Sequence, residues 1–430
     1  MSRKTSSGRA TALPGWLYVL FLALLATGTD EFIIAGILPE VASDLDVGTS
    51  AAGQLVTAFA VVYALSAPVL AVVFGRFAKR SLMVGGLVVF VLANAGAALA
   101  PGYPELMACR VVAALAAAVV TSAAFTTAAE GAPDGMSGRY LSVATAGMTA
   151  ALFTGVPLGS WLGGVLGWRA TFWLIAVVAA VAAAGLLGTA PRIGGSAPAP
   201  LRERLAPLRS TAVLRLVAVT FLAGSGGLMF YTYLSAYVAR TASESHTLLS
   251  LMLLVVGVAG LAGALLSGRA SDALGPRRGL HLVIGGHVIA LALAAGIGFG
   301  GVGGPLVVGA VVAFWSVFAW GLNPPIQGSI MRAAGPEAGM PALALNISGL
   351  YLGTGVAGAL GGILVAATDV RFVPLLASGL LLVSFLLTLP RSPGAAGGRA
   401  SRRAERPDGS PSRSSAPPDS TGREPAAVEQ

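Results

Sequence analysis

The chain has 430 residues, of which 55% are hydrophobic and only 10% are charged, and its formal net charge is +9 at pH 7. A water-soluble protein of this length needs far more charged surface, so the composition excludes an ordinary soluble globular fold. The single cysteine, Cys109, excludes an internal disulfide framework and a cysteine metal cluster.

The apolar residues occur in long runs that are separated by short polar breaks. A run of about 20 apolar residues is long enough to cross the hydrocarbon core of a bilayer as a helix. We predict an all-α integral membrane protein with twelve transmembrane helices: 16–38, 51–73, 82–100, 105–128, 140–163, 168–189, 213–238, 248–267, 280–299, 305–326, 342–366 and 373–389. The first run follows basic residues, as in a signal peptide, but it is too long for one, so we expect it to be retained.

The positions of the basic residues predict the orientation. With a cytoplasmic N-terminus, 23 of the 27 Lys and Arg residues lie inside, Arg169, Arg240 and Arg371 lie outside, and Arg110 lies within a span. We therefore expect a multi-pass protein of the cell membrane with both termini in the cytoplasm. Its basic loops are expected to face anionic lipid, and no nucleic acid is needed to explain the charge.

Three landmarks recur in the two parts of the chain at similar spacing. A basic loop with glycine follows span two at 75–80 and span eight at 268–278, rows of small residues run through spans five and eleven, and an Arg is followed closely by a Phe at the start of spans six and twelve. This repetition predicts two pseudo-symmetric six-helix halves. We expect a cytoplasmic N-terminus at 1–15, halves at 16–189 and 213–389, a cytoplasmic linker at 190–212, and a disordered cytoplasmic tail at 390–430.

These features resemble the major facilitator superfamily over residues 16–389. The loop after span eight carries the family pattern at Gly268, Arg269, Asp272, Gly275, Arg277 and Arg278, whereas Gly75 stands where the first copy usually has aspartate. The glycine–proline run Gly155, Pro157 and Gly159 resembles the signature of the family's drug–proton antiporters. Around Arg110, alanines replace the usual Gln and Gly of the family's buried-arginine motif.

A narrower resemblance concerns the substrate. The strings ACRVVAALA at 108–116, GWRATFW at 167–173 and ASGLL at 377–381 are similar to actinobacterial chloramphenicol-efflux proteins. The resemblance implies proton-coupled export of chloramphenicol or related phenicols. We separately expect a monomer without a cofactor or metal. Sugar-efflux relatives share several of these features, so export of a sugar or metabolite stays open.

Asp30 and Glu31 are the only acidic residues well inside a predicted span, and Arg110 is the only basic one. An intramembrane carboxylate is costly unless it is protonated, paired or exposed to water, so we expect this set to couple transport to protons. Adjacent residues point about 100° apart on a helix, and Glu31 is the better match to the family motif. Arg110 lies at a similar depth, which permits pairing with a carboxylate; a fixed ion pair that only joins helices is the alternative.

Polar and aromatic residues of the central spans are candidates for lining a substrate cavity: Gln54, Tyr63, Tyr231, Tyr233, Asn323, Asn346 and Tyr351, with Trp315 and Trp320 as further possibilities. Tyr and Trp also anchor helices at membrane interfaces, which is the simpler interpretation of each. The glycine run with Pro157 is expected to allow close helix packing and to control movement of the halves. The loop at 268–278 either forms a cytoplasmic latch or only sets topology, and the three histidines are expected to be solvated or packed.

Other classes of protein fit less well. The sequence has no P-loop, no HExxH and no GxSxG, which argues against a membrane enzyme and against an ATP-driven pump. A channel or sensory protein is a further alternative. The two-fold repeat with isolated buried charges favours a transporter of the alternating-access type.

Overall fold

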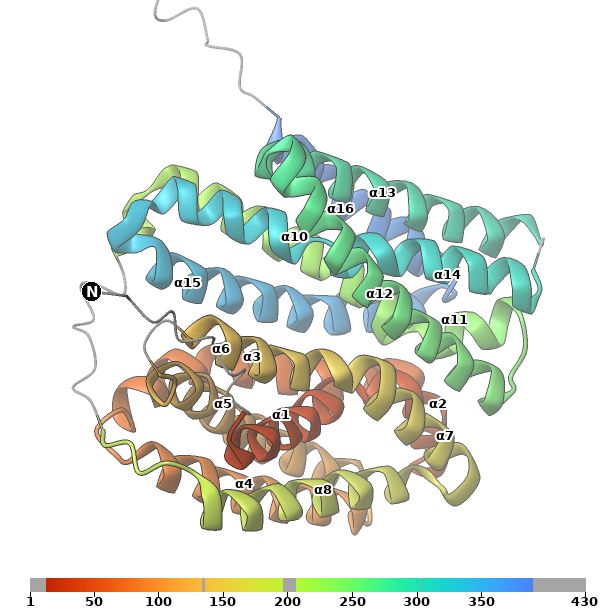
Figure 1. Ribbon diagram of the computed structural model, residues 1–430. Coiled ribbons are helices and arrows are strands. Elements are labelled where there is room, and N and C mark those ends of the chain that lie inside the picture. Colours follow the sequence, from red (N-terminus) through yellow and green to blue (C-terminus); the bar gives the residue numbers. More distant parts are fainter. Residues whose placement is uncertain (1–12, 134–135, 196–205, 302, 390–430) are drawn as a thin grey trace, which may run out of the picture. The chain divides into compact units, whose positions relative to one another are not determined.

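The computed structural model describes residues 13–133, 136–195, 206–301 and 303–389, and every regular element in these ranges is a helix (Figure 1). Up to Thr388 the described residues form one compact unit. Most of the predicted N-terminal segment, much of the predicted linker and the predicted tail lie outside the described residues.

The described residues of the first part of the chain form nine helical segments. They are α1 (Gly15–Phe32), α2 (Ile34–Asp44), α3 (Thr49–Val73), α4 (Lys79–Ala98), α5 (Tyr103–Glu130), α6 (Ser137–Ala150), the π-helical turn η1 (Ala151–Gly155), α7 (Val156–Leu166) and α8 (Trp168–Thr189).

The second part begins with a short 3₁₀ turn. Its segments are η2 (Ala206–Arg209), α10 (Thr211–Thr232), α11 (Leu234–Thr241), α12 (His246–Leu274), α13 (Pro276–Gly300), α14 (Pro305–Trp320), α15 (Asn323–Ala367) and α16 (Phe372–Thr388).

The lengths of these helices match a membrane. Among the described residues, ten helices are long and apolar enough to span a bilayer, and the bent pair α1–α2 raises the number to as many as eleven. The last predicted span corresponds to α16, which is apolar but only 17 residues long. The prediction of an all-α membrane protein is therefore confirmed, while the predicted total of twelve spans is supported for ten or eleven.

Several helices in the described part of the chain are interrupted. The chain bends by 51° between α1 and α2, directly after Glu31 and Phe32. The π-helical turn η1 precedes Pro157, whose ring would collide with the carbonyl of Phe153 in a regular α-helix, so the wider turn relieves that collision. Gly335 interrupts α15 with φ 75°, a left-handed conformation that glycine adopts without strain, and separates two apolar stretches.

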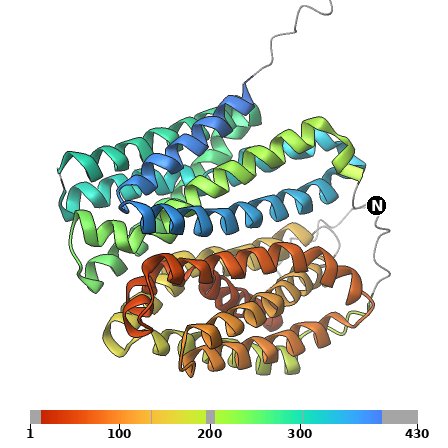
Figure 2. The ribbon, with the colours of Figure 1, turned by 180° about the vertical axis from the view of Figure 1, so that it is seen from behind.

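The helices α1–α8 and α10–α16 form two groups in Figures 1 and 2. The groups meet where α3 packs against α15 and where α12 packs against η1 and α7. We call them the first and second helix groups. The boundaries predicted for the halves, the linker and the tail stay predictions.

One end of the helices carries residues 74–78 and 190–195, where the amide of Lys79 donates to the carbonyl of Ile193 at 3.0 Å. We call this the linker end, and the end with residues 45–48, 99–102 and 242–245 the opposite end.

At the opposite end Asp369 lies between two helices. Its carboxylate accepts one hydrogen bond from the backbone N–H of Arg371 and another, at 3.1 Å, from the side chain of Arg371. The backbone hydrogen bond, followed by the side-chain bond and the charge of Arg371, holds the pKa of Asp369 below its ordinary value.

Candidate functional site

The adjacent carboxylates Asp30 and Glu31 have different environments. Asp30 is fully buried and forms an ion pair with Arg110 of α5, with 2.6 Å between Nη1 and Oδ1. A second N–H group of Arg110 donates to the backbone carbonyl of Asp30 at 3.0 Å, and the guanidinium lies over the ring of Phe59 at 4.5 Å. Arg110 thus contacts Asp30 rather than Glu31, and both partners of the pair belong to the first helix group.

Glu31 faces the second helix group. Tyr351 of α15 donates a hydrogen bond from its hydroxyl to Oε2 of Glu31 at 2.9 Å. The ring of Tyr63 of α3 stacks on the ring of Tyr351 with 4.2 Å between centroids. A protonatable group of one helix group is therefore joined by a hydrogen bond to the other, so a change in its charge would act directly on the contact between them.

Glu31 also lines a cavity of about 120 Å³, which we call the central cavity. Phe32 is the other lining residue from the first helix group, and the remaining wall comes from α10, α13, α14, α15 and residue 322. Of the predicted cavity residues, this wall includes Tyr351 and Asn323, and it also includes Trp320. A smaller hollow beside it shares Glu31 and Phe32 and adds Tyr231.

The other predicted cavity residues lie elsewhere. Tyr63 is buried behind Tyr351, and Trp315 is fully buried. Tyr233 donates from its hydroxyl to the carbonyl of Gly358 at 2.8 Å, which joins α15 to the break between α10 and α11. Asn346 is 6% exposed and, among the described residues, its Oδ1 has no hydrogen-bond partner. These residues shape the surroundings of the cavity rather than its wall.

Small residues bring α3 and α15 together. A side chain at Gly358 would collide with Thr57 of α3, and a Cβ at Gly362 would lie 2.9 Å from the amide nitrogen of Gln54. Gln54, predicted for the cavity, thus lies at the contact between the helix groups. Close backbone approach of this kind is how helices associate in a bilayer.

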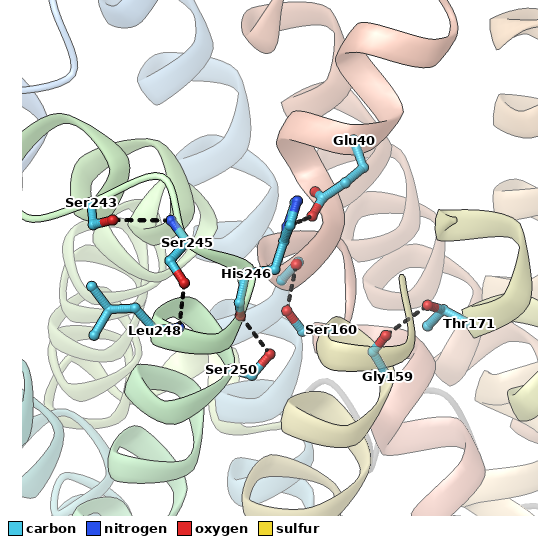
Figure 3. A network of polar contacts seen from close by, with 10 residues as sticks. Glu40, Gly159, Ser160, Thr171, Ser243, Ser245, His246, Leu248 and Ser250 are labelled. Atoms are coloured by element: carbon cyan, nitrogen blue, oxygen red, sulfur yellow. Dashed lines mark hydrogen bonds and ion pairs between the residues drawn. The ribbon is translucent and has the colours of Figure 1, made fainter. Parts of the chain in front are cut away.

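A polar contact joins the two helix groups at the opposite end, as Figure 3 shows. His246, the first residue of α12, pairs through Nδ1 with Oε1 of Glu40 on α2 at 2.8 Å. The imidazole lies against α7, where a Cβ at Gly164 would be 2.7 Å from it. On the same side, the hydroxyl of Ser160 donates to the carbonyl of Gly36 at 2.7 Å and ties α7 to α2 (Figure 3). His246 was expected to be solvated or packed, and its pairing with Glu40 adds a contact across the groups.

The predicted glycine–proline run lies on η1 and α7. A side chain at Gly155 would collide with Thr29 of α1, and a Cβ at Gly159 would lie 2.7 Å from Ile33. These positions allow α1 to pack closely within the first helix group, and they contact the helix that carries the acidic pair. Their control of movement stays a prediction.

The predicted latch residues occupy the α12–α13 connection. Gly268, Arg269 and Asp272 lie on the last turns of α12, Gly275 makes the turn with φ 82°, and Arg277 and Arg278 begin α13. Within the described ranges, Asp272 has no ion-pair partner within 4.0 Å. The latch therefore stays a prediction.

Phe32 and His287 are the aromatic lining residues that the sequence does not predict for the cavity. Phe32 directly follows Glu31, and its ring meets Tyr231 edge-on at 5.8 Å between centroids. His287 of α13 accepts a hydrogen bond at Nε2 from Nε1 of Trp315 at 3.0 Å. The sequence does carry a signal for His287, since it is a polar residue inside an apolar span, but that pattern alone predicts a solvated or packed side chain.

Comparisons with known proteins support a transporter. Residues 20–340 match the family model described as Major Facilitator Superfamily. The chain is 33% identical over 383 residues to the "Uncharacterized MFS-type transporter YbcL" of Bacillus subtilis, covering 88% of this chain and 96% of the relative. It is 36% identical over 393 residues to a "Chloramphenicol resistance protein" of Streptomyces lividans, with the same coverage of 88% and 96%.

The fold is also that of solved transporters. The structure superposes on a D-xylose–proton symporter with a TM-score of 0.71 at 19% identity, covering 89% of this chain and 98% of that one. It superposes on the peptide transporter POT with a TM-score of 0.72 at 13% identity, covering 89% and 94%. At these identities the likeness concerns the fold alone. The family match and the close relatives together show that this chain belongs to the Major Facilitator Superfamily and is a multi-pass membrane transporter rather than an enzyme.

Proposed function

We propose that this protein is a proton-coupled antiporter that exports a small drug, with chloramphenicol or a related phenicol as the substrate. The observation that carries the proposal is the position of Glu31, which lines the central cavity and accepts a hydrogen bond from the other helix group. The relative named a chloramphenicol resistance protein, 36% identical over most of both chains, supports the choice of substrate.

The coupling follows from the two states of the Glu31 carboxyl. The charged form accepts a charge-assisted hydrogen bond from Tyr351, which is roughly twice as strong as a neutral one. Protonation removes that charge, weakens the bond between the helix groups and makes the cavity neutral. Proton and substrate would then bind in turn. The charged carboxylate of Glu31 favours solvation and the strong hydrogen bond from Tyr351, whereas the protonated carboxyl favours a neutral cavity.

Asp30 and Arg110 have a supporting part in this proposal. Their pair holds α1 against α5 and thereby sets the direction in which Glu31 points. Arg110 stays occupied by Asp30, so it does not compete with Tyr351 for Glu31.

The setting of the proposal is the cell membrane. We propose a monomer with both termini in the cytoplasm and with lipid around its apolar faces. Large apolar side chains such as Leu92, Leu166 and Leu306 are exposed on the surface, as expected for helices that contact acyl chains.

The test is drug-driven proton release in inverted vesicles. The substitution Glu31→Gln keeps the shape of the side chain but cannot ionise, so it should abolish proton release on adding chloramphenicol. The matched control is Glu244→Gln, which changes an exposed carboxylate at the opposite end and should leave exchange intact. Full exchange by Glu31→Gln would refute the coupling residue. Absence of chloramphenicol-driven release from wild type beside release driven by a sugar would favour a sugar exporter.

A further inference from the structure

The second helix group contains a polar side chain that the coupling mechanism leaves unused. His287 is 2% exposed and lines the central cavity. Its Nε2 accepts from Nε1 of Trp315 at 3.0 Å. An indole N–H can only donate, so this imidazole nitrogen carries no proton, and the proton of the neutral ring is on Nδ1.

The Nδ1–H group has no hydrogen-bond partner among the described residues, although it belongs to a buried side chain in the wall of a cavity. Buried polar groups are nearly always hydrogen-bonded, so a donor left free beside a cavity points to a ligand atom that accepts from it. Glycine makes this position possible. A Cβ at Gly227 of α10 would lie 2.7 Å from Cε1 of His287 and force the ring away.

Aromatic rings surround the same part of the cavity. Phe32 and Trp320 line it, with 6.4 Å between their centroids. Tyr231 meets Phe32 edge-on, and Trp315, which donates to His287, meets Trp320 at 5.7 Å and 83°. The central cavity has about 120 Å³, and apolar cavities of roughly 150 Å³ hold one benzene molecule. The volume of the cavity is therefore close to that needed by a single aromatic ring.

The charges of the wall restrict the ligand further. Glu31 is the only side chain with a formal charge among the residues that line the cavity in the described part of the chain. The guanidinium of Arg110 is held by Asp30 and is not part of the wall. An anionic ligand would lie near a carboxylate with no cation to balance it, so an anion is disfavoured, and once Glu31 is protonated the wall carries no charge and suits an uncharged ligand.

We infer that His287 is a substrate-binding residue that donates a hydrogen bond from Nδ1 to an acceptor group on an uncharged aromatic substrate, and that Trp315 is the positioning residue that holds the imidazole in this tautomer. The inference rests on the proposed function and names the substrate class of the same cavity. Aromatic molecules with a nitro, sulfonyl or carbonyl group belong to this class.

Two probes test the inference on the full-length protein in detergent: chloramphenicol, and the same molecule with hydrogen in place of its nitro group. Wild type should bind chloramphenicol about tenfold more tightly than the nitro-free probe, as expected for one buried hydrogen bond. His287→Phe keeps an aromatic ring but no donor, so it should remove this preference and leave affinity for the nitro-free probe within about twofold.

Two further variants guard against a loss of folding. Trp315→Phe leaves His287 in place but frees its tautomer, so the preference between the probes should fall without disappearing. His281→Phe is the control on the same helix, because His281 contacts the carbonyl of Thr388 rather than the cavity, and it should keep the wild-type preference.

The outcomes separate the two proposals. An unchanged preference in His287→Phe and Trp315→Phe overturns the inference and leaves the proposed function standing. Failure of wild type to bind either probe overturns the phenicol substrate and the subsite together. Proton release by Glu31→Gln tests the coupling residue alone, and its outcome does not depend on either binding result.

Discussion

Replacing Asp30 by leucine should destabilise the protein strongly, because the guanidinium of Arg110 would be left buried without a counter-charge. Arg110 and Asp30 are 1% and 0% exposed, so neither charge is solvated by water. Removing one partner of such a pair typically costs about 3–5 kcal/mol. We expect the unfolding midpoint of Asp30→Leu in detergent to fall by several degrees.

The double variant Asp30→Leu with Arg110→Met should recover most of this loss. Within the described residues, Oδ2 of Asp30 and Nε of Arg110 have no hydrogen-bond partner, so the pair offsets the cost of desolvating its charges incompletely. Replacing a buried ion pair by apolar residues of similar volume is then close to neutral. The double-mutant cycle should give a coupling energy of about 3 kcal/mol.

The assay is thermal unfolding followed by size-exclusion chromatography, with proton release measured on the same preparations. Recovery of stability in the double variant, with coupled proton release, would assign Asp30 a structural role and leave coupling to Glu31. The reasoning would be refuted if Asp30→Leu were as stable as wild type and yet failed to release protons, since Asp30 would then be the coupling group.

Three further predictions concern contacts between and around the helix groups. Gly358→Val should abolish transport at normal protein levels, because it separates α3 from α15, whereas Gly85→Val, in open space on α4, should have no effect. His246→Ala and Glu40→Gln should each slow transport, and the double variant should be no slower than either single variant, because both substitutions break the same contact. Additive effects of the two substitutions would contradict this prediction. Asp369→Asn should lower the free energy of unfolding by less than about 1 kcal/mol at neutral pH. The pKa of Asp369 is depressed in the folded protein, so the stability difference between the variant and wild type should disappear as the pH falls through that lowered pKa. A difference that persists in acid would refute this prediction.

Much of the helical architecture follows from features that are local in sequence. Runs of about 20 apolar residues specify helices of bilayer length whatever their neighbours are, and Pro157 predicts irregular hydrogen bonding, which takes the form of a π-helical turn. The predicted number of membrane spans has less support at α16, because a helix of 17 residues is near the lower limit for a span.

The site depends on how helices are rotated against one another, which no local pattern contains. The sequence predicts that Asp30 and Glu31 point in different directions, but their partners, Arg110 and Tyr351, lie 80 and 320 residues away. The depth of Arg110 in its span was compatible with either carboxylate. Only the packing of α1 against α5 determines that Asp30 is the one it contacts.

His287 illustrates the same limit. Its chemistry comes from the N–H of Trp315, 28 residues away, and from the space left on another helix by a glycine. In the sequence it is a single histidine in an apolar run, which is more often a packed residue than a ligand.

The buried ion pair of Asp30 and Arg110 has a consequence for the driving force of transport. Its two charges cancel and belong to one helix group, so they move together and displace no net charge across the membrane. Under the proposed coupling, the electrical work of a cycle then depends only on Glu31 and the cargo. Exchange of an uncharged molecule for one proton carries one elementary charge inward, and a potential of 100 mV contributes about 2.3 kcal/mol, enough for a roughly 50-fold concentration ratio without any difference in pH. A singly charged cationic cargo would lose this contribution, so voltage itself would discriminate between cargoes that the cavity binds equally well.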